Sequence, residues 1–337
     1  MMLFVRADSN TEISGGHIMR CLSIAKCYME SGKRACFLVA DDNPTKVLEE
    51  ANMPYIVLNS DWRNLMSDVE QVKDIIKVES NAVLLIDTYS ITREYVEQFN
   101  GVCRVAYLGS KKEYFGQLDT LVNYSSDIDY EFYNEKYGID TKLLLGISYA
   151  PLRMEFQNVV HNYKSRIERV LLTTGQTERN QMVERILDAI SNILGNVYID
   201  VIVGRMFDNK SYLINKYKSN SYIWLHENVQ DISRIMNKCD LAISANGTTV
   251  YELSALGIPT ISFAMVEEQE RSAKALERLG IVDYSGSSFD KPSECADLIK
   301  RKVEFYLYHN DELISMARKA HDLIDGNGCF KIVRALE

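Results

Sequence analysis

The 337-residue chain has 38 Lys and Arg against 47 Asp and Glu, a formal net charge of −9, and 46% of its residues are hydrophobic. This acidic balance argues against a nucleic-acid-binding protein, which needs a basic face. No run approaches the roughly eighteen apolar residues of a membrane-spanning helix, and the N-terminus lacks a signal-peptide pattern, so we expect a cytoplasmic protein without membrane insertion. The length suffices for two domains, each with its own core.

Cysteine and histidine usage bears on redox state and on cofactors. The seven cysteines form no C-x-x-C pair and most lie in apolar runs, as reduced structural thiols do. The five histidines lack the spacing of metal ligands. We therefore expect no metal site and no other cofactor.

The first half of the chain alternates short apolar runs with amphipathic segments, which predicts alternating strands and helices. The expected strands are residues 3–5, 35–40, 55–58, 82–86, 102–108, 121–123 and 143–145, and the expected helices are 18–29, 44–51 and 65–76. The periodicity is lost over 124–137. A polar segment at 156–164, expected to be helical, leads into the second half.

The second half repeats the alternation, with expected strands at 169–173, 197–203, 222–225, 241–244 and 260–263. Helices are expected at 181–194 and 229–237, after Gly247, and around 273–279. Three helices are expected beyond Lys291. The pattern predicts an α/β protein with two Rossmann-like, doubly wound domains facing a central cleft. We place the domains at 1–157 and 158–337, with the last helix packing back on the first domain.

The loop after the first strand ends in Gly15, Gly16 and His17 at the start of a helix. Paired glycines let the backbone approach a ligand closely, and the N-terminal end of a helix favours an anion. An imidazole at this point can accept a proton at neutral pH. His17 is therefore a candidate general base, and the alternative is that it caps the helix or packs beneath the loop.

Asp87 and Tyr89 follow the buried strand at 82–86. Ligands of open α/β sheets bind beyond the carboxyl ends of the strands, so we expect both side chains at the same edge as His17. Asp87 could orient an imidazole or bind a sugar hydroxyl. The alternative is that Asp87 caps the next helix and Tyr89 packs on the surface.

A second candidate anion site comes from Asn246, Gly247, Thr248 and Thr249, which follow the strand at 241–244 and open a helix. Free backbone N–H groups, hydroxyls and the helix dipole together suit a diphosphate without a metal. Glu252, one turn into the helix, could accept hydrogen bonds from a ribose. The alternatives are ordinary helix capping by the threonines and a solvated surface charge for Glu252.

Two further loops belong to the same half of the chain. Gly175 and Gln176 lie between a strand and a helix, as the opening loop does, and are candidate nucleotide-binding residues. Glu268 and Gln269 precede another helical segment, and Gln269 could point at a sugar. Glutamates in a first helical turn are also common for dipole reasons alone.

Together these loops resemble a known family. The segments Arg6–Leu22, Leu85–Tyr89, Tyr149–Phe156 and Ser244–Pro259, with the D-G-N-G of Asp325–Gly328, are similar to the PseG family of nucleotide-sugar hydrolases in pseudaminic acid biosynthesis. The D-S-x-x-x-I-x-x-G-H-I-x-R spacing of the first motif is specific. The wider kinship is to glycosyltransferases of the MurG-like, GT-B architecture.

The resemblance implies an enzyme that hydrolyses a UDP-linked 2,4-diacetamido-2,4,6-trideoxy sugar to UDP and free sugar, without metal and with inversion at the anomeric carbon. It implies that His17 is the general base, with Asp87 and Tyr89 beside it. It also implies ribose binding by Glu252 and sugar contact by Gln269. The first motif adds further candidate ligand-binding residues, namely Arg6, Asp8, Gly15, Gly16 and Arg20.

This chain departs from the family pattern at Ser14, Gln176, Glu178 and Glu268, which bears on the loops and on the sugar recognised. Two other interpretations remain open: a MurG-like glycosyltransferase with a UDP-sugar donor, and a non-catalytic nucleotide-sugar-binding protein. In each case the partner is a small-molecule nucleotide sugar. The sequence leaves the amino sugar, the base and the oligomeric state open, with a monomer as the expectation.

Overall fold

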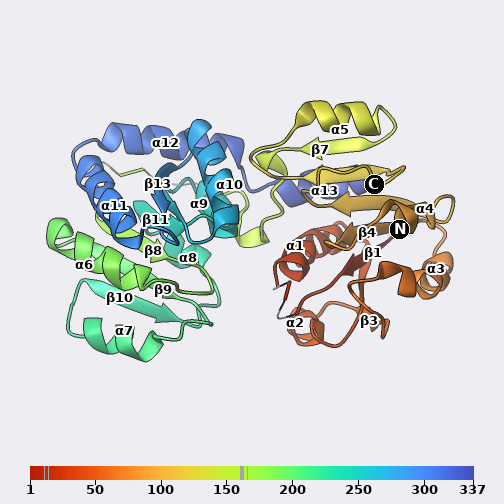
Figure 1. Ribbon diagram of the computed structural model, residues 1–337, viewed down its shortest axis with the longest axis horizontal. Coiled ribbons are helices and arrows are strands. Elements are labelled where there is room, and N and C mark those ends of the chain that lie inside the picture. The colour runs from red at the N-terminus through yellow and green to blue at the C-terminus, as the bar shows by residue number, and fades with distance from the viewer. Residues whose placement is uncertain (11, 14, 160–162, 165) are drawn as a thin grey trace. The chain divides into compact units, whose positions relative to one another are not determined.

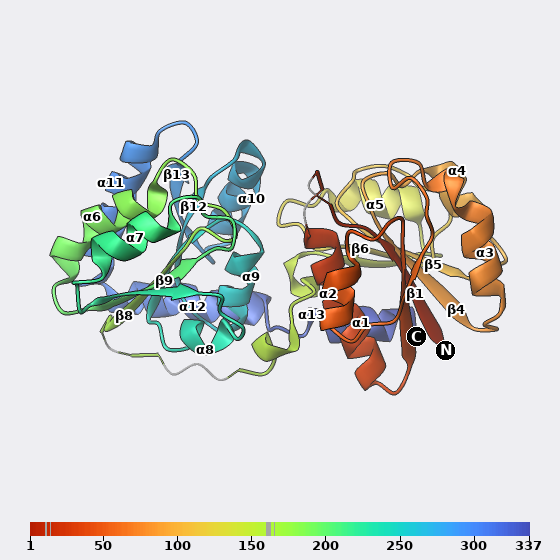
Figure 2. The same cartoon turned by 90° about the horizontal axis from the view of Figure 1, so that it is seen from below.

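The computed structural model describes residues 1–10, 12–13, 15–159, 163–164 and 166–337. These residues divide into two compact units, Met1–Met154 with Asn327–Glu337, and Glu155–Gly326. The chain therefore returns to the first unit at its end. Figures 1 and 2 show the elements of each unit from two directions.

The first unit contains a parallel sheet with the strand order β3-β2-β1-β4-β5-β6-β7. Its strands are β1 (Met2–Ala7), β2 (Arg34–Val39), β3 (Tyr55–Val57), β4 (Ala82–Asp87), β5 (Arg104–Leu108), β6 (Thr120–Asn123) and β7 (Lys142–Leu145). The order reverses between β1 and β4, as in a doubly wound sheet, and a ligand site is expected at the carboxyl ends of these two strands.

Alternate residues of each strand serve the two faces of this sheet. Leu3 and Val5 pack with α1 (Gly16–Glu30), α2 (Thr45–Glu50) and α13 (Gly328–Leu336). Phe4 packs with α3 (Val69–Lys77), α4 (Arg93–Glu97) and α5 (Tyr130–Tyr137). Short 3₁₀ turns lie at Leu65–Ser67, Ile147–Tyr149 and Met154–Phe156. The sheet is thus covered on both faces, which explains its nearly continuous apolar strands.

The second unit contains a parallel sheet with the order β10-β9-β8-β11-β12-β13. Its strands are β8 (Arg169–Thr173), β9 (Tyr198–Val203), β10 (Ile223–Glu227), β11 (Leu241–Ala245), β12 (Thr260–Ala264) and β13 (Asp283–Ser287). Its helices are α6 (Met182–Leu194), α7 (Lys210–Tyr217), α8 (Ser233–Met236), α9 (Thr248–Ala255), α10 (Glu267–Arg278), α11 (Pro292–Tyr306) and α12 (Asn310–Leu323).

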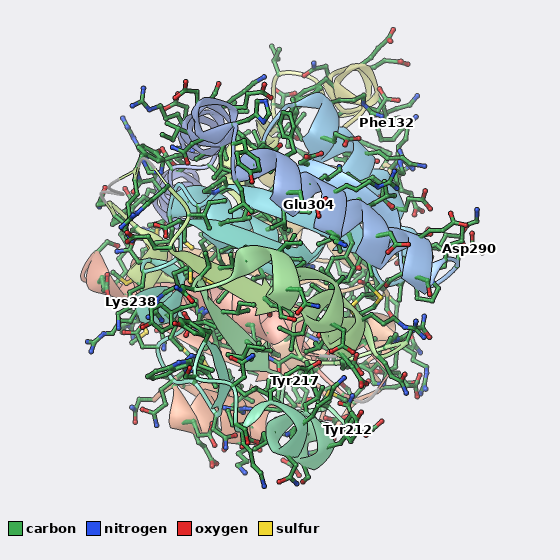
Figure 3. The ribbon with its side chains drawn as sticks, turned by 90° about the vertical axis from the view of Figure 1, so that its left-hand side faces the viewer. Phe132, Tyr212, Tyr217, Lys238, Asp290 and Glu304 are labelled. Atoms are coloured by element: carbon green, nitrogen blue, oxygen red, sulfur yellow. The ribbon has the colours of Figure 1, made fainter. Side chains whose placement is uncertain are left out.

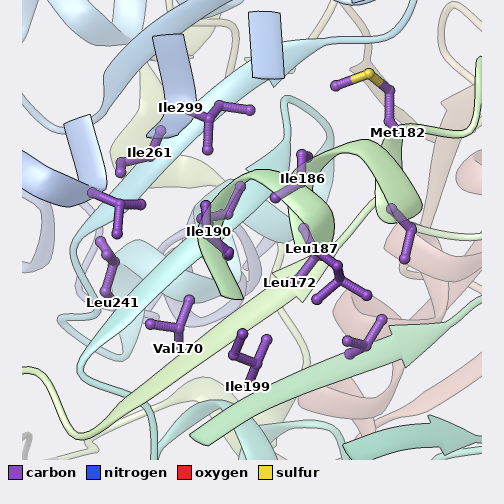
Figure 4. Close-up of a cluster of buried hydrophobic side chains, with 14 of the residues drawn as sticks. Val170, Leu172, Met182, Ile186, Leu187, Ile190, Ile199, Leu241, Ile261 and Ile299 are labelled. Carbon is purple, nitrogen blue, oxygen red and sulfur yellow. The ribbon is translucent and has the colours of Figure 1, made fainter. Parts of the chain in front are cut away.

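The core of the second unit lies between this sheet and the pair α6 and α11. Figure 4 shows Ile186 and Ile190 of α6 and Ile299 of α11 above Val170 and Leu172 of β8. On α7, the phenols of Tyr212 and Tyr217 (Figure 3) donate to carboxylates of α6, at 2.6 Å to Glu184 and 2.8 Å to Asp188. Helices α9 and α10 pack against β11, β12 and β13.

The expected fold class is confirmed, because both halves contain a doubly wound parallel sheet. The three expected helices beyond Lys291 are α11, α12 and α13. The expected helix at 65–76 is divided into a 3₁₀ turn and α3, and the helix expected at 229–237 shortens to α8. The helix expected at 156–164 is wrong for the described residues, which show only the 3₁₀ turn ending at Phe156; residues 160–162 lie outside them.

Four elements escaped the sequence pattern: α4, α5, α7 and β13. The sequence of β13, DYSGS, has no apolar alternation, and its Asp283 carboxylate accepts from the Tyr306 hydroxyl of α11 at 2.9 Å. Helix α5 buries only Tyr133 and Tyr137, and its start is set by Asp129, which accepts from the N–H of Phe132 at 3.0 Å. Capping, not periodicity, defines that helix.

All seven cysteines are free thiols, as expected, and six of them are buried. Over the part of the chain that the structure describes, none of the helices has the length and apolar character required to span a membrane.

Candidate active site

His17 and Asp87 come together at the point where the strand order of the first sheet reverses. Strands β1 and β4 are neighbours, with Ala7 opposite Asp87 in the register. Asp87 ends β4, and His17 is the second residue of α1, the helix that follows β1. The Nδ1 atom of His17 lies 2.6 Å from Oδ1 of Asp87. The alternative in which Asp87 caps the next helix is not found, because Thr92 caps α4.

Arg20 holds the other side of the Asp87 carboxylate. Its Nε donates to Oδ2 at 2.5 Å, its Nη2 contacts Oδ1, and its Nη1 donates to the Tyr124 hydroxyl at 3.2 Å. The Cys21 thiol donates to the same Oδ2 at 3.3 Å. Burial by itself would raise the pKa of Asp87, but Arg20 and His17 outweigh burial and lower it. Asp87 is therefore a carboxylate at neutral pH.

The ionised state of Asp87 fixes the tautomer of His17. A carboxylate can only accept hydrogen bonds, so Nδ1 of the neutral ring must carry the hydrogen that lies between it and Oδ1. The lone pair of Nε2 is then available to accept a proton. This is the arrangement of an oriented general base.

Tyr89 lies at the surface beside this imidazole. Its ring meets that of His17 edge-on, with centroids 4.6 Å apart and an interplanar angle of 89°. Tyr89 is 59% exposed, whereas His17 is only 3% exposed. Tyr89 is thus an exposed neighbour of a nearly buried imidazole.

The start of α1 is open. Gly15 is its N-cap, and among the described residues no side chain caps the helix. A Cβ built on Gly15 or Gly16 would meet no atom of the described chain within 4 Å, and neither glycine has a positive φ. The protein's own packing therefore gives no reason for glycine at these positions, whereas a ligand close to the backbone would. Ser14, the departure noted above, lies outside the described residues.

Arg6 and Asp8, expected to bind ligand, lie inside the protein. Arg6 is 0% exposed, donates from Nε to Asp68 at 3.1 Å and contacts Asp8. Asp8 is 3% exposed and accepts from the N–H of Ala40 at 2.6 Å. Asp68 also accepts from Tyr95 at 3.3 Å. This network fixes the strand ends, and the Arg6 guanidinium has no exposed surface with which to reach a ligand.

In the second unit, the loops after β8 and β9 are joined by main-chain contacts. The N–H of Met206 donates to the carbonyl of Gln176 at 3.0 Å. A Cβ on Gly204 would lie 2.3 Å from the Gly175 carbonyl oxygen, so only glycine permits this approach. Gly175 itself has φ +82°, a conformation that favours glycine. The Gln176 side chain is exposed at the resulting edge.

The start of α9 also has an uncapped N-terminus. Gly247 is its N-cap, no side-chain cap is found among the described residues, and Thr248 is exposed. The alternative of ordinary capping by the threonines is therefore not found. Asn246 is 5% exposed; its Nδ2 donates to the Gln269 carbonyl at 3.3 Å, and its Oδ1 has no hydrogen-bond partner in the described chain. Glu252 lies partly buried along the same helix.

The candidates Gln269 and Glu268 and the departure Glu178 differ in their surroundings. The Oε1 atom of Gln269 accepts from the N–H of Met265 at 2.8 Å, which holds the loop before α10. Glu268 is exposed in the first turn of α10. Glu178 accepts from the N–H of Val183 at 3.2 Å and from Asn209 at 3.1 Å, so it holds the start of α6. Burial raises the pKa of this carboxyl.

Sequence reasoning missed Tyr124 and the pairing of Arg20 with Asp87. Tyr124 directly follows β6, so the rule that ligand sites gather at carboxyl ends of strands could have placed it. The pairing had no such signal. In the described residues, no group of three or more His, Cys, Asp or Glu side chains is arranged to hold a metal ion.

No family model matches the chain. An uncharacterised protein of Methanocaldococcus jannaschii is 23% identical over 77% of this chain and 55% of its own length, and the spore coat polysaccharide biosynthesis protein SpsG of Bacillus subtilis is 21% identical over 59% of each chain. The chain thus spans a little over half the length of these two relatives. A UDP-2,4-diacetamido-2,4,6-trideoxy-β-L-altropyranose hydrolase of Campylobacter jejuni is 23% identical over 84% of this chain and 99% of its own length.

Solved structures agree on the fold. MurG of Acinetobacter baumannii matches with a TM-score of 0.68 and 13% identity over 99% of each chain. A UDP-GlcNAc 2-epimerase of Neisseria meningitidis, bound to UDP-GlcNAc, matches with a TM-score of 0.66 and 13% identity over 100% of this chain and 99% of its own. The protein has the GT-B fold.

Proposed function

We propose that this protein hydrolyses a UDP-linked 2,4-diacetamido-2,4,6-trideoxy sugar to UDP and the free sugar. The observation that carries the proposal is the contact of 2.6 Å between His17 and Asp87, which leaves Nε2 of a neutral imidazole as a proton acceptor at an open helix N-terminus. The similarity to the C. jejuni hydrolase over 99% of that enzyme's length supports this reaction over other reactions of the fold.

In the proposed reaction, Nε2 of His17 takes a proton from water as the water oxygen attacks the anomeric carbon. The bond between this carbon and the diphosphate oxygen breaks, its electron pair leaves with UDP, and the sugar is released with inverted configuration. Asp87 holds the ring through Nδ1–H, and Tyr89 covers its edge. General-base catalysis of this kind contributes about 10²–10⁴-fold to the rate.

The leaving diphosphate is assigned to the start of α9. The N–H groups at Gly247, Thr248 and Thr249 and the helix dipole would receive its negative charge, as the open N-terminus supports. We assign ribose binding to Glu252 and sugar contact to Gln269 and Glu268. Gly175 and Gln176 would border the nucleotide.

The test is to incubate the protein with UDP- and GDP-sugars in H₂¹⁸O and to follow products by NMR and mass spectrometry. We expect UDP, free sugar of inverted anomeric configuration, and ¹⁸O in the sugar alone. Label in the nucleotide would show attack at phosphorus and contradict the mechanism. UDP release that depends on an added acceptor would favour a glycosyltransferase, and a new UDP-sugar isomer would favour an epimerase.

His17→Asn should abolish UDP release while UDP binding, measured by calorimetry, persists. A matched control is His226→Asn, because His226 also lies 2.6 Å from a buried carboxylate, that of Asp200, but in the second unit. We expect this control to retain activity. A protein that binds UDP-sugars but never releases UDP would be a non-catalytic binding protein.

A further inference from the structure

The Nδ1 atom of His17 has two neighbours that cannot both bond to it. Oδ1 of Asp87 lies at 2.6 Å and Nη2 of Arg20 lies at 3.0 Å. A carboxylate only accepts and a guanidinium only donates, so Nδ1 can bond to one of them in a given tautomer.

The distances select the Asp87 bond. If Nδ1 accepted from Arg20, it would carry no hydrogen, and two acceptor atoms, Nδ1 and Oδ1, would face each other at 2.6 Å. With the hydrogen on Nδ1 the short contact becomes a hydrogen bond. Arg20 then stands beside the imidazole as a fixed positive charge that does not bond to it.

This positive charge changes what Asp87 does to the ring. A carboxylate alone beside an imidazole favours the imidazolium ion, whereas a neighbouring cation disfavours it. Arg20 is bonded to both oxygens of Asp87, so the carboxylate and guanidinium together are neutral. A neutral ring keeps this buried group uncharged overall, and a protonated ring would give it a net charge of about +1, which burial disfavours.

We propose that Arg20 neutralises Asp87 so that His17 remains an uncharged base near neutral pH, and that Arg20 is a positioning residue and not a ligand for the substrate. The role of His17 as a general base rests on the proposed hydrolysis. The neutral charge state of its ring does not depend on that proposal.

The other titratable groups around His17 add no further charge beside its ring. From α1 and α13, Cys21 and Cys329 are buried thiols, and burial raises the pKa of both. From β5, burial raises the pKa of Tyr107. The loops contribute the phenols of Tyr89, whose ring meets that of His17, and of Tyr124, whose hydroxyl accepts from Arg20. Asp87 and Arg20 are thus the charges that these elements bring to His17.

The test is a titration of ¹⁵N-histidine-labelled protein by NMR, with the His17 signals assigned through His17→Asn. In the wild type we expect the neutral ring to carry its hydrogen on Nδ1. Arg20→Gln removes the charge and should raise the His17 protonation midpoint by about 1 to 3 pH units. Arg20→Lys retains the charge and should leave the midpoint close to that of the wild type.

A matched control is Arg169→Gln, because Arg169 binds Asp200 at 2.6 Å, and Asp200 in turn contacts His226. This variant should leave the His17 midpoint unchanged, just as Arg20→Gln should leave that of His226 unchanged. A His17 midpoint in Arg20→Gln that equals or falls below the wild-type value overturns the proposal.

A second pair of variants serves if Arg20→Gln does not fold. Asp87→Asn and the double variant Arg20→Gln/Asp87→Asn differ only in the charge of Arg20, and the double variant leaves no buried charge unpaired. We expect the higher His17 midpoint in the double variant. Equal midpoints overturn the proposal.

The activity profile adds a readout that separates this role from substrate contact. In Arg20→Gln the acidic limb of the pH-rate profile should move upward with the NMR midpoint, so that activity lost at pH 7 returns in part at higher pH. A KM raised equally at all pH values would instead show substrate contact and contradict the positioning role. If the midpoints behave as expected but UDP-sugars are not hydrolysed, the proposed function fails and the charge assignment stands.

Discussion

Asp87 and His17 are 70 positions apart in the chain, yet their side chains meet at 2.6 Å. They meet because β1 and β4 are adjacent parallel strands, Asp87 ends β4, and His17 lies at the start of the helix that follows β1. A doubly wound sheet places its ligand site at this reversal of strand order. The pairing is therefore a product of topology, and it can be tested separately from the reaction.

The first prediction concerns the pH dependence of the reaction. With His17 as the base, the pH-rate profile should have an acidic limb, because a protonated imidazole cannot take a proton from water. Initial rates measured between pH 5 and 8 at saturating substrate would establish this limb. A flat profile over that range would argue against an imidazole base.

The second prediction concerns acid stability. Burial would raise the pKa of Asp87, but Arg20 and His17 lower it in the folded protein. A lowered folded-state pKa stabilises the protein above the unfolded value, about 4, and this stabilisation is lost as the pH falls through the folded-state value. The stability difference between wild type and Asp87→Asn should therefore be largest at neutral pH and shrink in acid.

At pH 7, Asp87→Asn leaves the Arg20 guanidinium without its carboxylate, which we expect to cost about 3–5 kcal/mol in the free energy of unfolding. Urea denaturation at pH 7 and at pH 3 would measure both values. The control is Asp290→Asn, which changes an exposed carboxylate and should be nearly neutral at either pH. An Asp87→Asn deficit that is as large at pH 3 as at pH 7 would contradict the assignment.

The third prediction compares two glycines of the second unit. Gly204→Ala places a Cβ 2.3 Å from the Gly175 carbonyl oxygen, so we expect a loss of about 1–3 kcal/mol in stability. Gly247→Ala meets no described atom within 4 Å and has φ −119°, so its stability should stay near that of the wild type.

If UDP binds at the start of α9, Gly247→Ala should nevertheless weaken UDP binding tenfold or more, about 1.4 kcal/mol. Calorimetric titration with UDP and thermal unfolding of both variants would separate the two effects. Unchanged UDP affinity in Gly247→Ala would place the diphosphate elsewhere.

The fourth prediction is that EDTA leaves the hydrolysis rate unchanged. It follows from the absence of metal-ligand spacing among the histidines and cysteines in the sequence. The measurement is the initial rate after dialysis against EDTA, compared with a sample dialysed against buffer. Inhibition that Mg²⁺ or Mn²⁺ reverses would contradict a metal-free mechanism.

Much of this architecture could be predicted from local sequence, because buried parallel strands such as Ala82–Asp87 are continuous apolar runs. The neighbourhood of His17 and Asp87 followed from one general rule about strand ends. The polar strand β13 could not be found in this way, since periodicity needs apolar residues.

The sequence motif predicted the role of each side chain less well than the apolar runs predicted the strands. Arg6, Asp8 and Arg20 share one motif, but Arg6 and Asp8 form a buried network with Asp68, and Arg20 binds Asp87. Asp68 lies far along the chain from that motif and is brought to it by the packing of α3 and its preceding turn. Spacing within a motif does not reveal such distant partners.

The return of the chain to the first unit links the integrity of that unit to residues that are translated after the second unit. Cys329, Ile332, Val333 and Leu336 of α13 belong to the same apolar cluster as Ile18 and Leu22 of α1. A ribosome that has released everything up to Gly326 has therefore supplied the whole of the second unit but not the cover of the helix that carries His17. Premature termination after Gly326 would leave the second unit complete, although it is made later. It would remove from the first unit the helix that packs on α1.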